Sequence, residues 1–304
     1  MDLAVEIKQG NRRAIARAIS MVENNEKEAR ILIKKIFKSS GGSFTIGITG
    51  PAGAGKSTLI NKTSMMLNKF GYKTAILAID PTSHITGGAI LGDRVRMTES
   101  TDSGTYIRSM ASRGATGAIS MALRNCIRIL EFAGFDPIII ESVGAGQTEV
   151  DISRIVDATV VVFNPNTGDN IQTIKAGLTE IGDIYLVNKS DLPGASQLFD
   201  SVRDFIGMSE KNPTVMMTST KSNKGIAEFA KKLQELMEIR KKTKKQTEEA
   251  KLDAELRDIV LNNVKNKMSS MLDSSSIYTK YLKKVQSKKL DPFEAAEKIS
   301  KIFK

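Results

Sequence analysis

A chain of 304 residues is long enough for one large α/β domain with helical additions, or for two small domains. Forty per cent of its residues are hydrophobic, which allows a sizeable core and argues against wholesale disorder. The net charge of +11 comes mostly from residues 240–304, which hold 17 Lys+Arg against 9 Asp+Glu.

Two residue types are nearly absent. The single cysteine, Cys126, excludes an intramolecular disulfide, and the single histidine, His84, excludes a histidine-rich metal centre. The first residues have no basic region followed by an apolar run, and no stretch of about 18 apolar residues occurs. Few aromatic residues accompany the C-terminal lysines, which disfavours nucleic acid as a partner. We therefore expect a cytoplasmic protein that binds neither membrane nor nucleic acid.

The chain reads as a helical start, an α/β middle and a helical end. Apolar residues at helical spacing predict two short helices over residues 2–38, with a break near Gly10 and Asn11. From Phe44, short apolar runs alternate with amphipathic segments, which predicts a mainly parallel sheet with helices on both faces. The expected strands are Phe44–Thr49, Thr74–Asp80, Pro137–Glu141, Thr159–Asn164, Ile184–Asn188 and Thr214–Ser219.

After Gly225 the sequence predicts helix to its end, with a solvated stretch at 241–246 that interrupts the apolar periodicity. We divide the chain into an N-terminal helical segment (1–40), a nucleotide-binding domain (41–240) and a C-terminal helical segment (241–304).

A phosphate-binding loop follows the first expected strand. It matches G-x-x-x-x-G-K-[ST] and precedes an amphipathic helix, which is the context that this motif requires. The glycines allow a tight turn whose N–H groups face a phosphate, and the helix N-terminus adds its positive dipole end. The motif assigns Lys56 to the β- and γ-phosphates and the Ser57 hydroxyl to Mg²⁺. The nucleotide-binding residues are Gly50, Pro51, Ala52, Gly53, Ala54, Gly55, Lys56, Ser57 and Thr58.

A base-reading motif, N-K-x-D, ends the strand at 184–188. The Asp191 carboxylate can accept hydrogen bonds from N1–H and the exocyclic amine of guanine, whereas adenine would leave it unpaired. We expect Asn188 to meet the base edge and to hold neighbouring loops, and the Lys189 stem to cover one ring face. After the next strand, a third base-contacting loop is expected at Ser219, Thr220 and Lys221. The predicted ligands are therefore GTP and GDP.

Carboxylates at strand ends complete the predicted site. Asp80 and Glu141 end two expected strands, and ligands of open α/β sheets bind at the carboxyl ends of strands. We assign Ser57, Asp80 and Glu141 to Mg²⁺, and Lys56 and Glu141 to GTP hydrolysis. Asp93 lies in the loop 87–94, which the strand positions do not place, and it is a further candidate for both roles. The P-loop contains no arginine that could serve as a catalytic finger. Other arginines in expected neighbouring loops are Arg94, Arg96, Arg108 and Arg113.

Five stretches resemble one family of P-loop NTPases, the MeaB/ArgK GTPases that serve adenosylcobalamin-dependent acyl-CoA mutases and include the methylmalonic aciduria type A protein. They are GPAGAGKST (50–58), AIDPTSHITGGAILGDRVRM (78–97), ESVGAGQTE (141–149), NPNTGDNIQTIKAG (164–177) and NKSD (188–191). The segments GNRRAIARAI (10–19) and DPFEAAEKI (291–299) are also similar to the family, so the resemblance covers nearly the whole chain.

The resemblance implies a homodimeric GTPase chaperone of methylmalonyl-CoA mutase or a related acyl-CoA mutase. In this family GTP binding and hydrolysis gate cobalamin loading and protect the mutase. It also implies Mg²⁺ near Asp80, Asp93 and Glu141, a third switch loop at 165–172, and dimer contacts from the C-terminal helices. The residues themselves favour switch segments at 82–93, 144–149 and 165–172.

Two other functions remain open on sequence grounds. A nickel insertase would need a cysteine or histidine metal site, for which the chain offers Cys126 and His84 alone. A P-loop kinase would need an acceptor pocket and a lid, and it would leave the N-K-x-D motif without a use.

Overall fold

The computed structural model describes residues 2–80, 104–111, 116–142, 147–166, 179–207 and 213–302. It describes the main chain alone at Asp80, 116–119, 147–148, 179, 244–247 and 302. The chain forms two compact units, Met1–Lys251 and Leu252–Lys304. The division at residues 40 and 240 stays a prediction.

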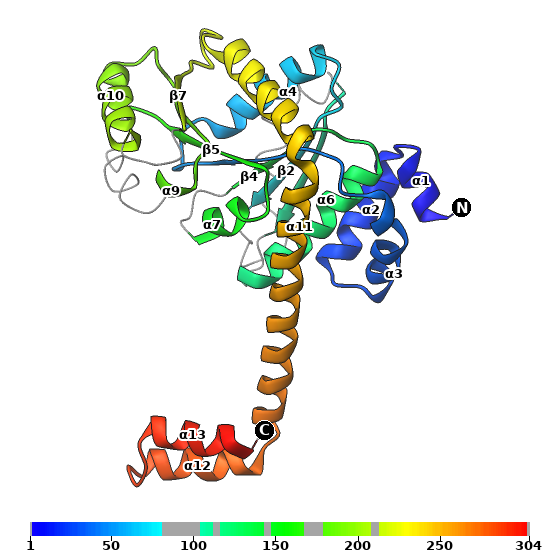
Figure 1. The fold of residues 1–304 in the computed structure, drawn as a ribbon, viewed down its shortest axis with the longest axis vertical. Helices are drawn as coiled ribbons and strands as arrows, with labels where there is room; N and C mark the ends of the chain where they lie inside the picture. The colour runs from blue at the N-terminus through cyan, green and yellow to red at the C-terminus, as the bar shows by residue number, and fades with distance from the viewer. Residues whose placement is uncertain are drawn as a thin grey trace. The chain divides into compact units, whose positions relative to one another are not determined.

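A seven-stranded sheet lies at the centre of the first unit, in the order β3-β2-β4-β1-β5-β6-β7. Figure 1 labels β2, β4, β5 and β7 of this sheet. Every neighbouring pair of strands is parallel, which confirms the predicted α/β fold. The central strands are buried on both faces and rich in β-branched residues, as a covered parallel sheet requires. The strands are β1 Thr45–Thr49, β2 Ala75–Asp80, β3 Tyr106–Ala111, β4 Ile138–Glu141, β5 Ala158–Phe163, β6 Ile184–Val187 and β7 Thr214–Met217.

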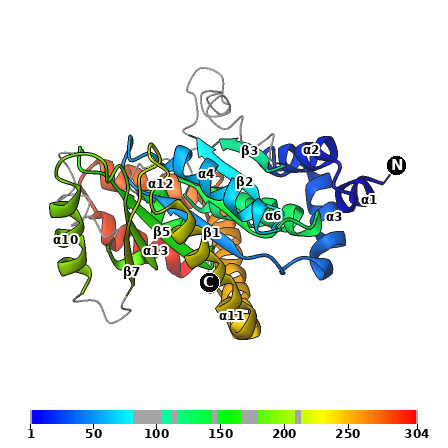
Figure 2. The same ribbon diagram turned by 90° about the horizontal axis from the view of Figure 1, so that it is seen from above.

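Helices cover both faces of this sheet (Figure 2). Buried residues of α4 and of the first turns of α11 join one face in a core cluster, and α6, α7 and α10 cover the other. The N-terminal helices α1 to α3 pack into the cluster that contains α6. The helices are α1 Leu3–Lys8, α2 Arg12–Glu23, α3 Lys27–Ile36, the 3₁₀ turn η1 Phe37–Ser39, α4 Lys56–Lys69, α6 Thr116–Phe132, α7 Gln147–Ser153, α9 Thr179–Ile181, α10 Ala195–Ile206, α11 Ile226–Asp273, α12 Ser276–Gln286 and α13 Pro292–Ile302.

Two sequence expectations are corrected. The start of the chain forms three helices rather than two, because a second break at Asn24 and Asn25, where Asn25 has φ 53°, separates α2 from α3. A further strand, β3, lies at the edge of the sheet and is half-buried. It contains an arginine, a serine and an alanine, so it lacks the continuous apolar run of the central strands. Helix α11 continues through 241–246, in agreement with the helix predicted after Gly225, because lysine is compatible with helix.

Asp157 attaches α11 to the sheet at the amino ends of the parallel strands. Its side chain is 2% exposed and accepts hydrogen bonds from Arg240 Nε and Lys251 Nζ, both at 2.7 Å. It also accepts from Thr45 N at 2.9 Å and from Thr45 Oγ1 at 2.7 Å. Burial alone would raise the pKa of Asp157, but the neighbouring Lys251, Arg240 and Thr45 N–H outweigh it and lower the pKa below its usual value of 3.8.

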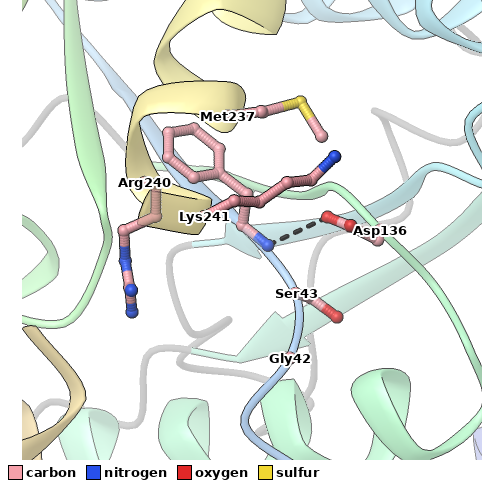
Figure 3. A pocket seen from close by; sticks show the side chains of 7 residues that line it. Gly42, Ser43, Asp136, Met237, Arg240 and Lys241 are labelled. Carbon is pink, nitrogen blue, oxygen red and sulfur yellow. Dashed lines mark hydrogen bonds between the residues drawn. The ribbon is translucent and has the colours of Figure 1, made fainter. Parts of the chain in front are cut away.

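A small hollow lies at the same end of the strands (Figure 3). Residues that precede β1 and β4 form one side of it, and one turn of α11 forms the other. There Phe44 N donates to Asp136 Oδ1 at 2.9 Å. The lining residues are Gly42, Ser43, Phe44, Asp136, Met237, Arg240 and Lys241. Because ligands of such sheets bind at the carboxyl ends of strands, this hollow is not the nucleotide site. None of the helices in the described ranges has the length and apolar character needed to cross a membrane.

Candidate nucleotide-binding site

The phosphate-binding loop connects the central strand β1 to α4. Gly50 has φ 141°, and a Cβ placed on it would lie 2.1 Å from the carbonyl oxygen of Val162 on β5. Gly55 is the left-handed N-cap of α4, with φ 89°. A Cβ there would lie 2.5 Å from Asn188 Nδ2. The two glycines are therefore required by close contacts as well as by backbone conformation.

Lys56 lies across this loop. The residue is 7% exposed, and its Nζ donates to the carbonyl oxygens of Gly50 at 2.8 Å and Pro51 at 3.2 Å. The ammonium group is thus held beside the backbone turn that the motif assigns to the phosphates. Together with the N-terminal end of the 14-residue helix α4, it makes this loop a suitable binding site for an anion.

Ser57 and Glu141 come together at the carboxyl end of the sheet. Ser57 Oγ donates to Glu141 Oε1 at 2.7 Å, and Glu141 is 5% exposed at the end of β4. The adjacent Ser142 donates to Thr49 Oγ1 at 2.9 Å, which ties the end of β4 to β1. Hydroxyl and carboxylate oxygens are the ligands that Mg²⁺ prefers, so the donor set fits this ion.

The structure places the other two predicted metal ligands only in part. The main chain of Asp80 ends β2, next to β4 on the same edge as Glu141, while its side chain is not described. Asp93 lies outside the described residues, as do His84, Arg94, Arg96, Arg113, and most of the predicted switch segments. In the described ranges, no group of three or more His, Cys, Asp or Glu side chains is placed to hold a metal ion.

Asn188 connects three loops. Its side chain is fully buried, donates from Nδ2 to the Ala54 carbonyl at 2.9 Å, and accepts from Thr218 Oγ1 at 3.2 Å. This residue therefore links the phosphate-binding loop to the end of β7. Of its two expected roles, the contacts between loops are present in the structure.

The residues predicted to read the base lie on the loops after β6 and after β7. Lys189 adopts φ 55°. Asp191 is exposed, and its Oδ1 accepts a hydrogen bond from Ser219 Oγ at 2.5 Å. That hydrogen bond lowers the pKa of Asp191, and Lys221 and Lys189 lower it further, so the carboxylate stays charged. Ser219 is fully buried, whereas Thr220 is half-buried and Lys221 exposed.

Asn164 was not assigned to the site from its sequence. It follows β5, is 1% exposed, and donates from Nδ2 to the Gly53 carbonyl at 3.3 Å. Its Oδ1 accepts from Asn166 N at 2.8 Å. The available signal was an asparagine at the carboxyl end of a central strand, inside the NPNTGDN stretch. Arg108, expected in a loop, instead lies on β3 and pairs with Glu23.

Comparison with known proteins decides the family. The model of the methylmalonyl Co-A mutase-associated GTPase MeaB matches residues 15–273. The chain is a member of the MeaB family. As a MeaB family GTPase it binds guanine nucleotide, and the resemblance drawn from its five motifs is confirmed.

One relative and one solved structure span nearly the whole chain. A protein of Pyrococcus abyssi is 40% identical over 310 residues, covering 99% of this chain and 95% of its own length. The GTPase ArgK of Escherichia coli is 34% identical over 236 residues, covering 73% of this chain and 71% of its own. A solved structure described as a LAO/AO transport system kinase has a TM-score of 0.76 at 25% identity, covering 99% of this chain and 96% of its own.

Proposed function

We propose that this MeaB family protein is a Mg²⁺-dependent GTPase that gates adenosylcobalamin loading of methylmalonyl-CoA mutase, or a related acyl-CoA mutase, and protects the enzyme. The observation that carries the proposal is the contact between Ser57 and Glu141. It joins the phosphate-binding loop to the strand end from which the predicted switch segment 144–149 departs. A change at the γ-phosphate therefore has a short route, through Ser57 and Glu141, to this predicted switch segment.

Recognition of guanine is supported by the placement of Asp191. Its charged carboxylate lies on the loop that Asn188 ties to Ala54 of the phosphate-binding loop. Ser219 orients this carboxylate from the loop after β7. A nucleotide whose phosphates bind at Lys56 would therefore present its base to residues 188–191 and 219–221, and the paired donors of guanine suit a carboxylate acceptor.

Hydrolysis is proposed to use a metal ion held by Ser57, Asp80, Asp93 and Glu141. When bound, Mg²⁺ would neutralise charge on the β- and γ-phosphates. Lys56, whose Nζ lies at the Gly50 and Pro51 carbonyls, would stabilise the same charge. Without a partner we expect slow turnover, at about 10⁻⁴–10⁻² per second, because no arginine of the P-loop can supply further charge. Arg108 is not available as a finger, since Glu23 holds it.

The proposed homodimer is supported by exposed apolar residues of the second unit. Leu252, Leu256, Val260 and Val264 recur every four residues along α11 and are each between 45% and 62% exposed. Residues four apart share one face of a helix, so they form a continuous apolar stripe that a second copy could cover. Leu256→Lys should yield monomers in sedimentation velocity, whereas Ser269→Lys, about opposite on the helix, should not.

A nickel-insertase function is not supported by Cys126. This thiol is fully buried on α6, and burial raises its pKa far above the usual value. Because the thiolate is the form that binds metal, a buried and protonated thiol is a poor ligand. A kinase function would leave the orientation of Asp191 by Ser219 without a purpose.

Copurification from a native lysate tests the proposal. Tagged protein loaded with a non-hydrolysable GTP analogue should retain a cobalamin-dependent acyl-CoA mutase in an amount that differs from the GDP-loaded form. Glu141→Ala should still bind GTP but retain equal amounts in both states. Equal retention of the mutase by both forms of the parent protein would refute the gating claim, and absence of any cobalamin mutase would refute the client.

A further inference from the structure

An ion pair joins α2 to the edge strand β3. Strand β3 is an edge strand, and α2 lies along it (Figure 2). Glu23, the last residue of α2, accepts from Ala111 N at 3.2 Å through Oε1 and from Arg108 Nη2 at 3.0 Å through Oε2. Arg108 Nη2 also donates to Ser20 Oγ at 2.9 Å. The side chains of Glu23 and Arg108 are 11% and 20% exposed.

Covering an edge strand does not by itself require a charged pair. An apolar helix face would shield β3, and burying two charges carries a desolvation cost that a hydrophobic contact avoids. Arg108 also leaves its buried Nε without a hydrogen-bond partner in the described part of the chain. The specific feature of this pair is that one carboxylate oxygen holds the main chain at the carboxyl end of β3.

That end is in register with a proposed metal ligand. Ala111 pairs with Asp80 on β2, and β2 in turn pairs with β4, which ends in Glu141. We propose that Glu23, itself held by Arg108, is a positioning residue for the Mg²⁺ site: by fixing Ala111 it fixes the main chain of Asp80. This inference rests on the proposed function, in which Asp80 is a ligand of Mg²⁺.

The expected loss of metal affinity follows from the coordination geometry of Mg²⁺. Mg²⁺ requires near-octahedral geometry with short oxygen distances, so a small displacement of one ligand weakens it. Removing a residue that orients a metal ligand typically lowers metal affinity by about 10–100-fold. Because Glu23 acts through a main-chain pairing, we expect the lower end of this range. Nucleotide binding without metal depends on the phosphate-binding loop and residues 188–191, which Glu23 does not contact.

The test uses the full chain loaded with GDP. Binding of Mn²⁺, a spectroscopic substitute for Mg²⁺, is measured by electron paramagnetic resonance, and GDP affinity is measured separately in the presence of a chelator. Glu23→Gln should weaken Mn²⁺ binding about tenfold while leaving metal-free GDP affinity within about twofold. Arg108→Lys, which retains the charge but not the planar fork, should show a smaller change in the same direction. Glu28→Gln, at an exposed site on α3, is the matched control and should equal the parent.

Asp80→Asn separates this inference from the proposed function. If Asp80→Asn weakens Mn²⁺ binding and Glu23→Gln does not, the positioning role is wrong while the metal site stands. Equal losses of Mn²⁺ and metal-free GDP affinity in Glu23→Gln would show a merely structural role and overturn the inference. Unchanged Mn²⁺ binding in Asp80→Asn would refute the proposed metal ligand and the inference with it.

Discussion

Replacing Asn188 by alanine should weaken GTP and GDP equally while preserving the preference for guanine. The side chain is fully buried and makes two hydrogen bonds, one to the Ala54 carbonyl and one from Thr218. Both partners are themselves buried. The substitution therefore removes a link between loops and does not remove the carboxylate of Asp191.

The size of the loss in nucleotide affinity follows from the two groups that lose Asn188 as a hydrogen-bond partner. The Thr218 hydroxyl can rotate toward another acceptor, but the Ala54 carbonyl is fixed by the loop, so one buried acceptor loses its partner. An orphaned buried group costs about 1–3 kcal/mol. If the unpaired carbonyl destabilises the nucleotide-bound protein by this amount, the dissociation constants of GTP and GDP both rise by about 5–150-fold.

Fluorescence titration with labelled GDP, followed by competition with GTP and ATP, measures this effect. Asn266→Ala, at an exposed position of α11, is the matched control and should bind as the parent does. The reasoning would be refuted if Asn188→Ala lost its preference for GTP over ATP as completely as a variant of Asp191, or if its GDP affinity equalled that of the control.

Three other substitutions test separate parts of the structure. Asp191→Asn should shift preference from GTP toward XTP in competition binding, because the xanthine carbonyl suits an amide donor; an unchanged preference would refute the base-reading assignment. Lys56→Ala should slow single-turnover hydrolysis by about 100-fold or more, and a near-parental rate would contradict the role of its ammonium group. Asp157→Asn should lower the free energy of unfolding at neutral pH by about 3 kcal/mol in urea titrations, because Arg240 and Lys251 lose their buried counter-charge. Since the folded-state pKa of Asp157 lies below 3.8, this stabilisation is present above that pH and is lost as the pH falls through the lowered pKa, so the parent and the variant should converge in acid; a constant difference would contradict the pKa direction.

The sequence could predict those parts of the site whose residues lie close together in the chain and have a chemically required type. Gly50 and Gly55 occupy positions where a Cβ would collide with Val162 or Asn188, so the motif records a physical requirement. The buried β-branched runs of β4 and β5 are likewise recognisable from the sequence, because a strand covered on both faces is made mostly of apolar residues.

Features that depend on distant partners could not be predicted in this way. Strand β3 is recognisable only when α2 covers its edge, since Arg108 becomes compatible with a half-buried strand by pairing with Glu23, 85 residues earlier. The contact of Asn164 with Gly53 spans 111 residues. The attachment of α11 to Asp157 through Arg240 and Lys251 spans 83 and 94 residues. The roles assigned to Asp93 stay predictions.

The central claim is that nucleotide state controls binding to the mutase. Calorimetric titration of purified methylmalonyl-CoA mutase from the same cell with the protein, loaded either with GDP or with a non-hydrolysable GTP analogue, tests it most directly. We predict that the two dissociation constants differ by about 5–150-fold, the range of coupling free energies typical of allosteric proteins. Identical dissociation constants for the two forms would contradict the claim and leave a GTPase whose nucleotide does not control this partner.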